Sequence, residues 1–188
     1  MSEWPVQVRF GGLGGQGLIT LGAVLAEAGL RSGMKVAASQ SYGSRARGGV
    51  TRADVILSDG EIDFPHVLQP DLLIILAQEA YDMYLPDVVP GGLVMVDDFF
   101  VNPVEKEGVR QHAIPGTASA VEKIGNKVAA NFVMLGAMIG FTGMMVASEI
   151  TAAARSLVNP RFIQVNLEAF DLGFSLGKSL IASEDPWR

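Results

Sequence analysis

The sequence of 188 residues contains no cysteine and only two histidines, His66 and His112. Without thiols the chain cannot form disulfides, use a cysteine nucleophile, or ligate zinc or an iron–sulfur cluster through cysteine. The two histidines are far apart in the sequence, and neither accompanies a serine or an acidic cluster with metal-ligand spacing. We therefore expect no catalytic residue and no metal site in this chain, and any cluster must lie on another polypeptide.

Charged residues are also scarce, and their balance is acidic. They make up 18% of the chain, against 49% hydrophobic residues, and 14 basic and 20 acidic side chains give a net charge of -6. This sign disfavours a nucleic-acid partner or an anionic membrane surface. The high hydrophobic content has two explanations that composition leaves open, a well-filled α/β core or a surface that partner chains cover.

Signals for secretion or membrane insertion are missing as well. Residues Met1–Pro5 lack the charged and apolar regions of a secretory signal. The longest apolar stretch, Val128–Val146, contains Asn131 and several glycines, which is typical of a buried helix and not of a membrane span. We expect a cytoplasmic protein.

Strand and helix patterns alternate in the first two thirds of the chain. Short β-type runs, two of them continuously apolar as in parallel sheets, occur at Val6–Phe10, Lys35–Ser39, Val50–Ser58, Asp71–Ala77 and Leu93–Val96. Helical spacing occurs at Leu18–Leu30, Gln78–Leu85, Ala118–Ile124, Val128–Phe141, Ser148–Leu157 and Ile163–Ile181. These patterns predict an α/β fold with an open, mostly parallel sheet, flanking helices and a helical C-terminal third, in one domain of residues 1–188.

A glycine-rich turn follows the first strand and opens the first helix. Residues Gly12–Gly17 have the Gly-x-Gly-x-x-Gly spacing, which allows positive φ and places helix N–H groups before an anion. The turn predicts a phosphate site, with a tight strand-to-helix connection as the alternative. NAD is disfavoured because Val36–Gln40 has no acid for the ribose, and ATP is disfavoured because Leu18 and Ile19 replace the required Lys and Ser/Thr.

A second segment, Gln40–Arg52, reverses the local charge. It contains Arg45, Arg47 and Arg52 and no acid. Because the arginine fork suits phosphates and carboxylates, this loop could bind one together with the glycine-rich turn, if both lie at the carboxyl ends of strands. A loop whose arginines pair with a partner's carboxylates explains the same pattern.

Three motifs in this order resemble the gamma subunit of pyruvate- and 2-oxoglutarate-type ferredoxin oxidoreductases. They are Val8–Gly17, Ser41–Gly49 and Val55–Asp59, and the resemblance continues at Ala130–Ala137 and at Asn166 to Gly173. The positions carried over as cofactor-binding are Gly12, Gly14, Gly15, Gln16, Gly17, Tyr42, Gly43, Arg45, Arg47 and Gly48. Arg45 departs from the family, in which an acidic residue is expected.

The resemblance implies a complex that oxidatively decarboxylates a 2-oxoacid, with 2-oxoglutarate favoured, to an acyl-coenzyme A and reduces ferredoxin. Thiamine diphosphate, magnesium and iron–sulfur clusters would sit on the alpha, beta and possible delta subunits, while this chain supports assembly and contributes to the coenzyme A site. The alternative is a free-standing phosphate- or nucleotide-binding α/β module. An independent NAD-dependent dehydrogenase is weakened by the missing ribose acid.

Overall fold

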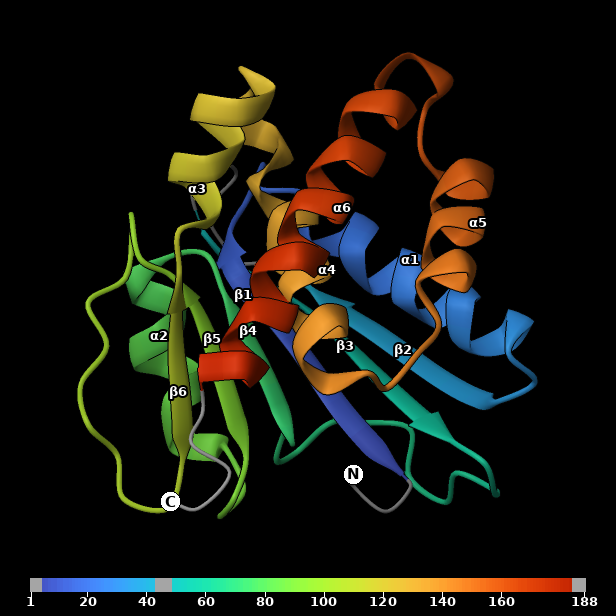
Figure 1. The fold of residues 1–188 in the computed structure, drawn as a ribbon. Helices are drawn as coiled ribbons and strands as arrows, with labels where there is room; N and C mark the ends of the chain where they lie inside the picture. Colours follow the sequence, from blue (N-terminus) through green and yellow to red (C-terminus); the bar gives the residue numbers. More distant parts are fainter. Residues whose placement is uncertain (1–4, 43–48, 184–188) are drawn as a thin grey trace.

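The computed structural model describes residues 5–42 and 49–183, and within them six strands form one sheet in the order β2-β3-β1-β4-β5-β6 (Figure 1). The strands are β1 (Val6–Leu13), β2 (Lys35–Ser41), β3 (Val50–Ser58), β4 (Leu72–Ile75), β5 (Leu93–Asp97) and β6 (Arg110–Ile114). β1, β4, β5 and β6 pair in parallel, whereas β3 runs antiparallel to both β1 and β2. The predicted α/β fold with a mostly parallel sheet is confirmed.

Three strands differ most from the sequence-based prediction, while β2 and β5 extend beyond it by two residues and one residue. β1 does not stop at Gly11 but continues to Leu13, because Gly11 and Gly12 pair with Arg52 and Thr51 of β3. β4 is shorter than predicted. β6 was not predicted at all, since Arg110–Ile114 is a polar edge strand without the apolar signal of its neighbours.

Four helices cover one face of the sheet (Figure 1): α1 (Leu18–Arg31), α4 (Ala130–Thr142), α5 (Ala147–Leu157) and α6 (Pro160–Ser183). α4 is buried around its whole circumference from Ala130 to Gly140, which confirms the prediction of a buried helix. No helix within residues 5–42 and 49–183 has both the length and the hydrophobicity needed to cross a membrane.

Glycines bring α4 and α6 into backbone contact. Gly136 and Gly140 of α4 lie against the backbone of Phe170 and Phe174. On α6, one turn apart, Gly173 and Gly177 lie against the carbonyl oxygens of Val133 and Ala137. A Cβ atom at any of these four positions would overlap the neighbouring backbone, so the pair depends on the absence of side chains.

The opposite face is only half covered. α2 (Gln78–Tyr84), continued by a 3-10 turn at Leu85–Asp87, packs on β1, β4 and β5 through a second apolar cluster that includes Tyr81 and Tyr84. On this face the residues of β3, including Asp54 and Ile56, are still buried, whereas the edge strand β2 is partly or fully exposed along its length. The predicted helix 118–124 forms as α3 (Gly116–Ser119) followed by a π-helical segment, Ala120–Ile124.

Candidate functional site at the carboxyl edge of the sheet

The glycine-rich turn and the loop after β2 meet at one edge of the sheet. β1 and β2 both end there, and the backbone N–H of Gly14 donates to the carbonyl oxygen of Gly49 at 3.1 Å. Tyr42 lies at the same edge and is 65% exposed. β1 and β2 thus end at the same edge, as predicted, while Gly43, Arg45, Arg47 and Gly48 lie outside the described residues.

The turn itself requires glycine. Gly15 and Gly17 adopt φ values of 98° and 76°, a left-handed conformation that residues with a Cβ rarely enter. Gly17 directly precedes Leu18, the first residue of α1. The N–H groups of this first helical turn, which have no partner within the helix, therefore lie at the carboxyl edge.

The side chain of Gln16 stabilises this turn with two hydrogen bonds. Its Oε1 accepts a hydrogen bond from the N–H of Leu13 at 2.6 Å, and its Nε2 donates to the carbonyl oxygen of Leu76 at 2.8 Å. Gly12 lies in β1 directly against this amide. Gln16 therefore links the end of β1 to the end of β4, while Gly14 bonds to Gly49 and Gly12 leaves room for the Gln16 amide. All three predicted cofactor-binding positions have a structural role in the turn.

Asn131 lies beside the turn at the start of α4. It is 6% exposed, and its side-chain amide packs directly on Gly17, where no Cβ would fit. It separates two cavities. One, of about 200 Å³, is lined by Gly15, Gln16, Thr117 and Lys127 among others.

The second cavity beside Asn131 measures about 410 Å³ and carries no charged residue in its lining. Its polar groups are the amides of Asn126, Asn159 and Asn166 and the hydroxyl of Thr20. Its apolar groups include Val128, Leu157 and Phe162. A neutral cavity of this kind suits an uncharged group with hydrogen-bonding atoms, while the smaller cavity offers the cation of Lys127 and the amides of the turn.

The acids that end β5 act within the protein. Asp97 is fully buried and accepts hydrogen bonds from the backbone N–H of Thr117 and, at 2.5 Å, from its hydroxyl. Asp98 is exposed, and partial desolvation of its carboxyl group together with the charge of Asp97 raises its pKa. Asp97 therefore ties β5 to the start of α3 and leaves no free carboxylate pair at this edge.

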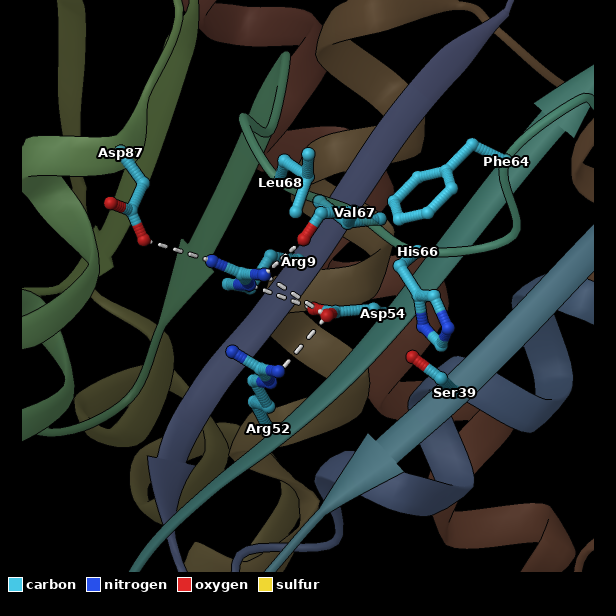
Figure 2. A pocket seen from close by; sticks show the side chains of 9 residues that line it. All are labelled: Arg9, Ser39, Arg52, Asp54, Phe64, His66, Val67, Leu68 and Asp87. Atoms are coloured by element: carbon cyan, nitrogen blue, oxygen red, sulfur yellow. Dashed lines mark hydrogen bonds and ion pairs between the residues drawn. The ribbon is translucent and has the colours of Figure 1, made fainter.

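A polar cluster on the half-covered face escaped the sequence analysis (Figure 2). Arg9, only 1% exposed, donates to both carboxylate oxygens of Asp54, at 2.8 and 3.0 Å, and to the carbonyl oxygen of Val67 at 2.7 Å. Burial alone would lower the pKa of Arg9, but its hydrogen bonds with Asp54 and the nearby acids raise it, so the guanidinium stays charged. The sequence signal for this pair is that each of two apolar strands contains one charged residue predicted to be buried, Arg9 in β1 and Asp54 in β3.

Arg52 belongs to this cluster. It lies on β3 with Nε 3.5 Å from Asp54 Oδ2 (Figure 2), and its guanidinium sits 6.0 Å from the centroid of the Tyr84 ring. This pair with Asp54 was not predicted from the sequence. The predicted action of Arg52 together with Arg45 and Arg47 stays a prediction, because those two arginines lie outside the described residues.

Comparison with known proteins identifies the family. The sequence profile described as pyruvate ferredoxin/flavodoxin oxidoreductase matches residues 7–176. The chain belongs to this family. A 2-oxoglutarate synthase subunit KorC from Methanocaldococcus jannaschii is 38% identical over 177 residues, covering 93% of this chain and 95% of the relative.

Solved structures agree with this assignment. The gamma subunit of a keto/oxoacid ferredoxin oxidoreductase from Geobacter sulfurreducens has a TM-score of 0.83 at 36% identity, covering 94% of this chain and 98% of that one. A 2-oxoglutarate:ferredoxin oxidoreductase from Magnetococcus marinus, with 2-oxoglutarate, coenzyme A and succinyl-CoA bound, has a TM-score of 0.85 at 25% identity. It covers 100% of this chain, which corresponds to 33% of that longer chain. Within the family, the chain is therefore of the gamma-subunit type.

Proposed function

We propose that this chain is the gamma subunit of a complex that oxidises 2-oxoglutarate, transfers the resulting acyl group to coenzyme A and reduces ferredoxin. Identity to the KorC subunit over nearly the full length of both chains supports this substrate. The ligands bound to the Magnetococcus marinus enzyme, 2-oxoglutarate, coenzyme A and succinyl-CoA, are the substrates and a product of the same reaction.

The redox chemistry is assigned to partner subunits. The chain has no cysteine to ligate an iron–sulfur cluster. Among the residues that the structure describes, no group of three or more His, Asp or Glu side chains could hold a metal ion. Thiamine diphosphate, magnesium and the clusters would lie on the alpha and beta subunits, and the isolated gamma chain is expected to be colourless and inactive with 2-oxoacids.

The part we assign to this chain is a share of the coenzyme A site at the carboxyl edge. The observation that carries it is the meeting of the glycine-rich turn with the loop after β2, through Gly14 and Gly49, beside the cavity of Lys127 and Asn131. N–H groups of the first turn of α1 and the Lys127 ammonium would bind phosphate oxygens. We assign the loop after β2, with Arg45 and Arg47, to the same phosphate-binding site.

Lys127→Met in the assembled complex tests this assignment. Loss of a charge-assisted phosphate contact, about 1.5–3 kcal/mol, should raise the KM for coenzyme A roughly 10- to 150-fold. Oxidation of 2-oxoglutarate before acyl transfer should stay unchanged, because that step precedes the use of coenzyme A. Lys123→Met is the matched control, since Lys123 pairs with Glu122 on the surface.

Two results would contradict the assignment. If coenzyme A saturates the intact Lys127→Met complex as it does the wild type, Lys127 does not bind the phosphate. Arg47→Ala, in the loop after β2, is a second test. If it weakens subunit association and every partial reaction together, that loop supports assembly and does not bind the ligand.

A further inference from the structure

On the α2 face of the sheet, the edge strand β2 is partly or fully exposed along its whole length. β3 beside it is buried, with Asp54, Ile56 and Ser58 at 3–4% exposure. β2 and β3 pair antiparallel, and such a pair can leave one face to solvent or to a partner. The cavity that adjoins β2 on this face is therefore a place where another chain can pack.

Small residues on β2 keep this surface hollow. The strand register sets Ser39 beside Asp54, and Ser41 beside Arg52, on the same face of the sheet. These side chains are too short to cover the charged groups. The resulting cavity, about 360 Å³, is closed on its far side by segment 64–68, which includes Phe64 and His66 (Figure 2).

Two cations of the cavity, Arg9 and Arg52, share the carboxylate of Asp54. Both oxygens of Asp54 accept hydrogen bonds from Arg9, and Asp87 accepts another from Arg9 Nη1 at 3.2 Å. Arg52 is 3.5 Å from Asp54, longer than a good N–H···O hydrogen bond, and its side chain is 38% exposed. Covering this surface with another chain would remove water from Arg52, which is costly unless that chain brings an anion.

Two large apolar side chains border the same hollow. Phe64 is 54% exposed and Leu68 is 66% exposed, and both line the cavity beside Arg52 and Ser39. A partner that fills the hollow would therefore meet one cation and two apolar groups. This combination is typical of the centre of a protein interface, where arginine and aromatic residues are enriched.

We propose that this surface, formed by Ser39, Arg52, Phe64 and Leu68, is an interface with another subunit, which sets a carboxylate against Arg52 and an apolar side chain between Phe64 and Leu68. The inference rests on the proposed function, because it takes the other subunits of the oxidoreductase as partners. A second copy of this chain fits less well. The carboxylates that line the cavity, Asp54 and Asp87, are already bound by Arg9 and would bring no spare anion to a symmetric contact.

Charge reversal at Arg52 tests the interface in the reconstituted complex. Arg52→Glu should raise the dissociation constant between this chain and the remaining subunits by roughly 30-fold or more, as expected for a truncated or reversed interfacial charge pair. Leu68→Ser should weaken it as well, and because Leu68 is exposed this change leaves the fold intact. Arg155→Glu, an exposed arginine on α5 at the other face, is the control for the same charge reversal.

A photo-crosslinking residue at Ser39 identifies the occupant. A link to a peptide of another subunit that contains Asp or Glu supports the proposal. A link to a second copy of this chain, or an intact complex with Arg52→Glu and no link at all, overturns it. If this chain fails to associate with any oxidoreductase subunit even as the wild type, the proposed function itself is wrong, which separates the two failures.

Discussion

The two faces of the sheet are stabilised in different ways. On the face of α1, α4, α5 and α6, apolar side chains form one continuous core, and Gly136 and Gly173 bring α4 and α6 into backbone contact. On the opposite face, a buried ion pair, Arg9 with Asp54, joins β1 to β3. The comparison teaches that a thinly covered face can contain the most sensitive single residues, because a buried charge tolerates the loss of its partner less well than an apolar core tolerates a lost methyl group.

Asp54→Ala should produce the largest change in stability. It removes both carboxylate oxygens from a guanidinium that is 1% exposed, which should cost about 3–5 kcal/mol in the free energy of unfolding. Urea denaturation measures this cost. The paired replacement Arg9→Met with Asp54→Leu should recover most of it, since no unpaired charge remains.

The control for Asp54 is Glu61→Ala, which breaks an exposed pair with Lys35 on the same part of the chain. This change should alter stability by less than about 1 kcal/mol. Equal costs for Asp54→Ala and Glu61→Ala would mean that the Arg9 pair contributes no more than a surface pair, and the contrast between the two faces would disappear.

Gly173→Ala is the corresponding test on the covered face. The added Cβ would overlap the carbonyl oxygen of Val133, and since the obstacle is backbone the helices must separate. We expect a loss of about 3 kcal/mol, the upper end of the usual cost of overpacking. Thermal unfolding measures this loss. In the same experiment Gly60→Ala should be nearly neutral, because its added Cβ atom would meet no other atom within 4 Å. A stable Gly173→Ala protein would show that α4 and α6 are not in tight contact.

Gln16→Ala should have the smallest of the three effects. It removes two hydrogen bonds between neutral groups, with Leu13 and Leu76, for a loss of about 1–2 kcal/mol. Gln164→Ala, which removes an exposed contact with Glu168 on α6, serves as the control and should change stability by less than about 0.5 kcal/mol. If Gln16→Ala leaves stability unchanged but raises the KM for coenzyme A, its amide contacts the ligand instead of bracing the turn.

Local patterns predicted most of the covered face. The apolar spacing of Leu18–Leu30 and the continuous apolar run around Met134 depend on neighbours within a few turns, and both helices form as expected. The glycine-rich turn was predicted for the same reason, because positive φ at Gly15 and Gly17 is a property of the chain itself.

The half-covered face could not be predicted in this way. Arg9 and Asp54 are 45 positions apart, and only the antiparallel register of β1 with β3 makes them neighbours. That register depends on the whole sheet, as does the direction of β3. The same dependence explains why the pair of Arg52 with Asp54 was not predicted, since a change of one position along a strand moves a side chain to the other face.

The contact between α4 and α6 also has a consequence for exchange with solvent. Amide protons that are shielded on every side exchange only when the surrounding unit opens, so those of α4 should be among the slowest in the protein. Asn131 lies in the first turn of this helix and packs on Gly17. The carboxyl edge is therefore anchored to the region with the slowest opening, and a ligand that binds there meets groups that are already in position and loses little entropy in ordering them.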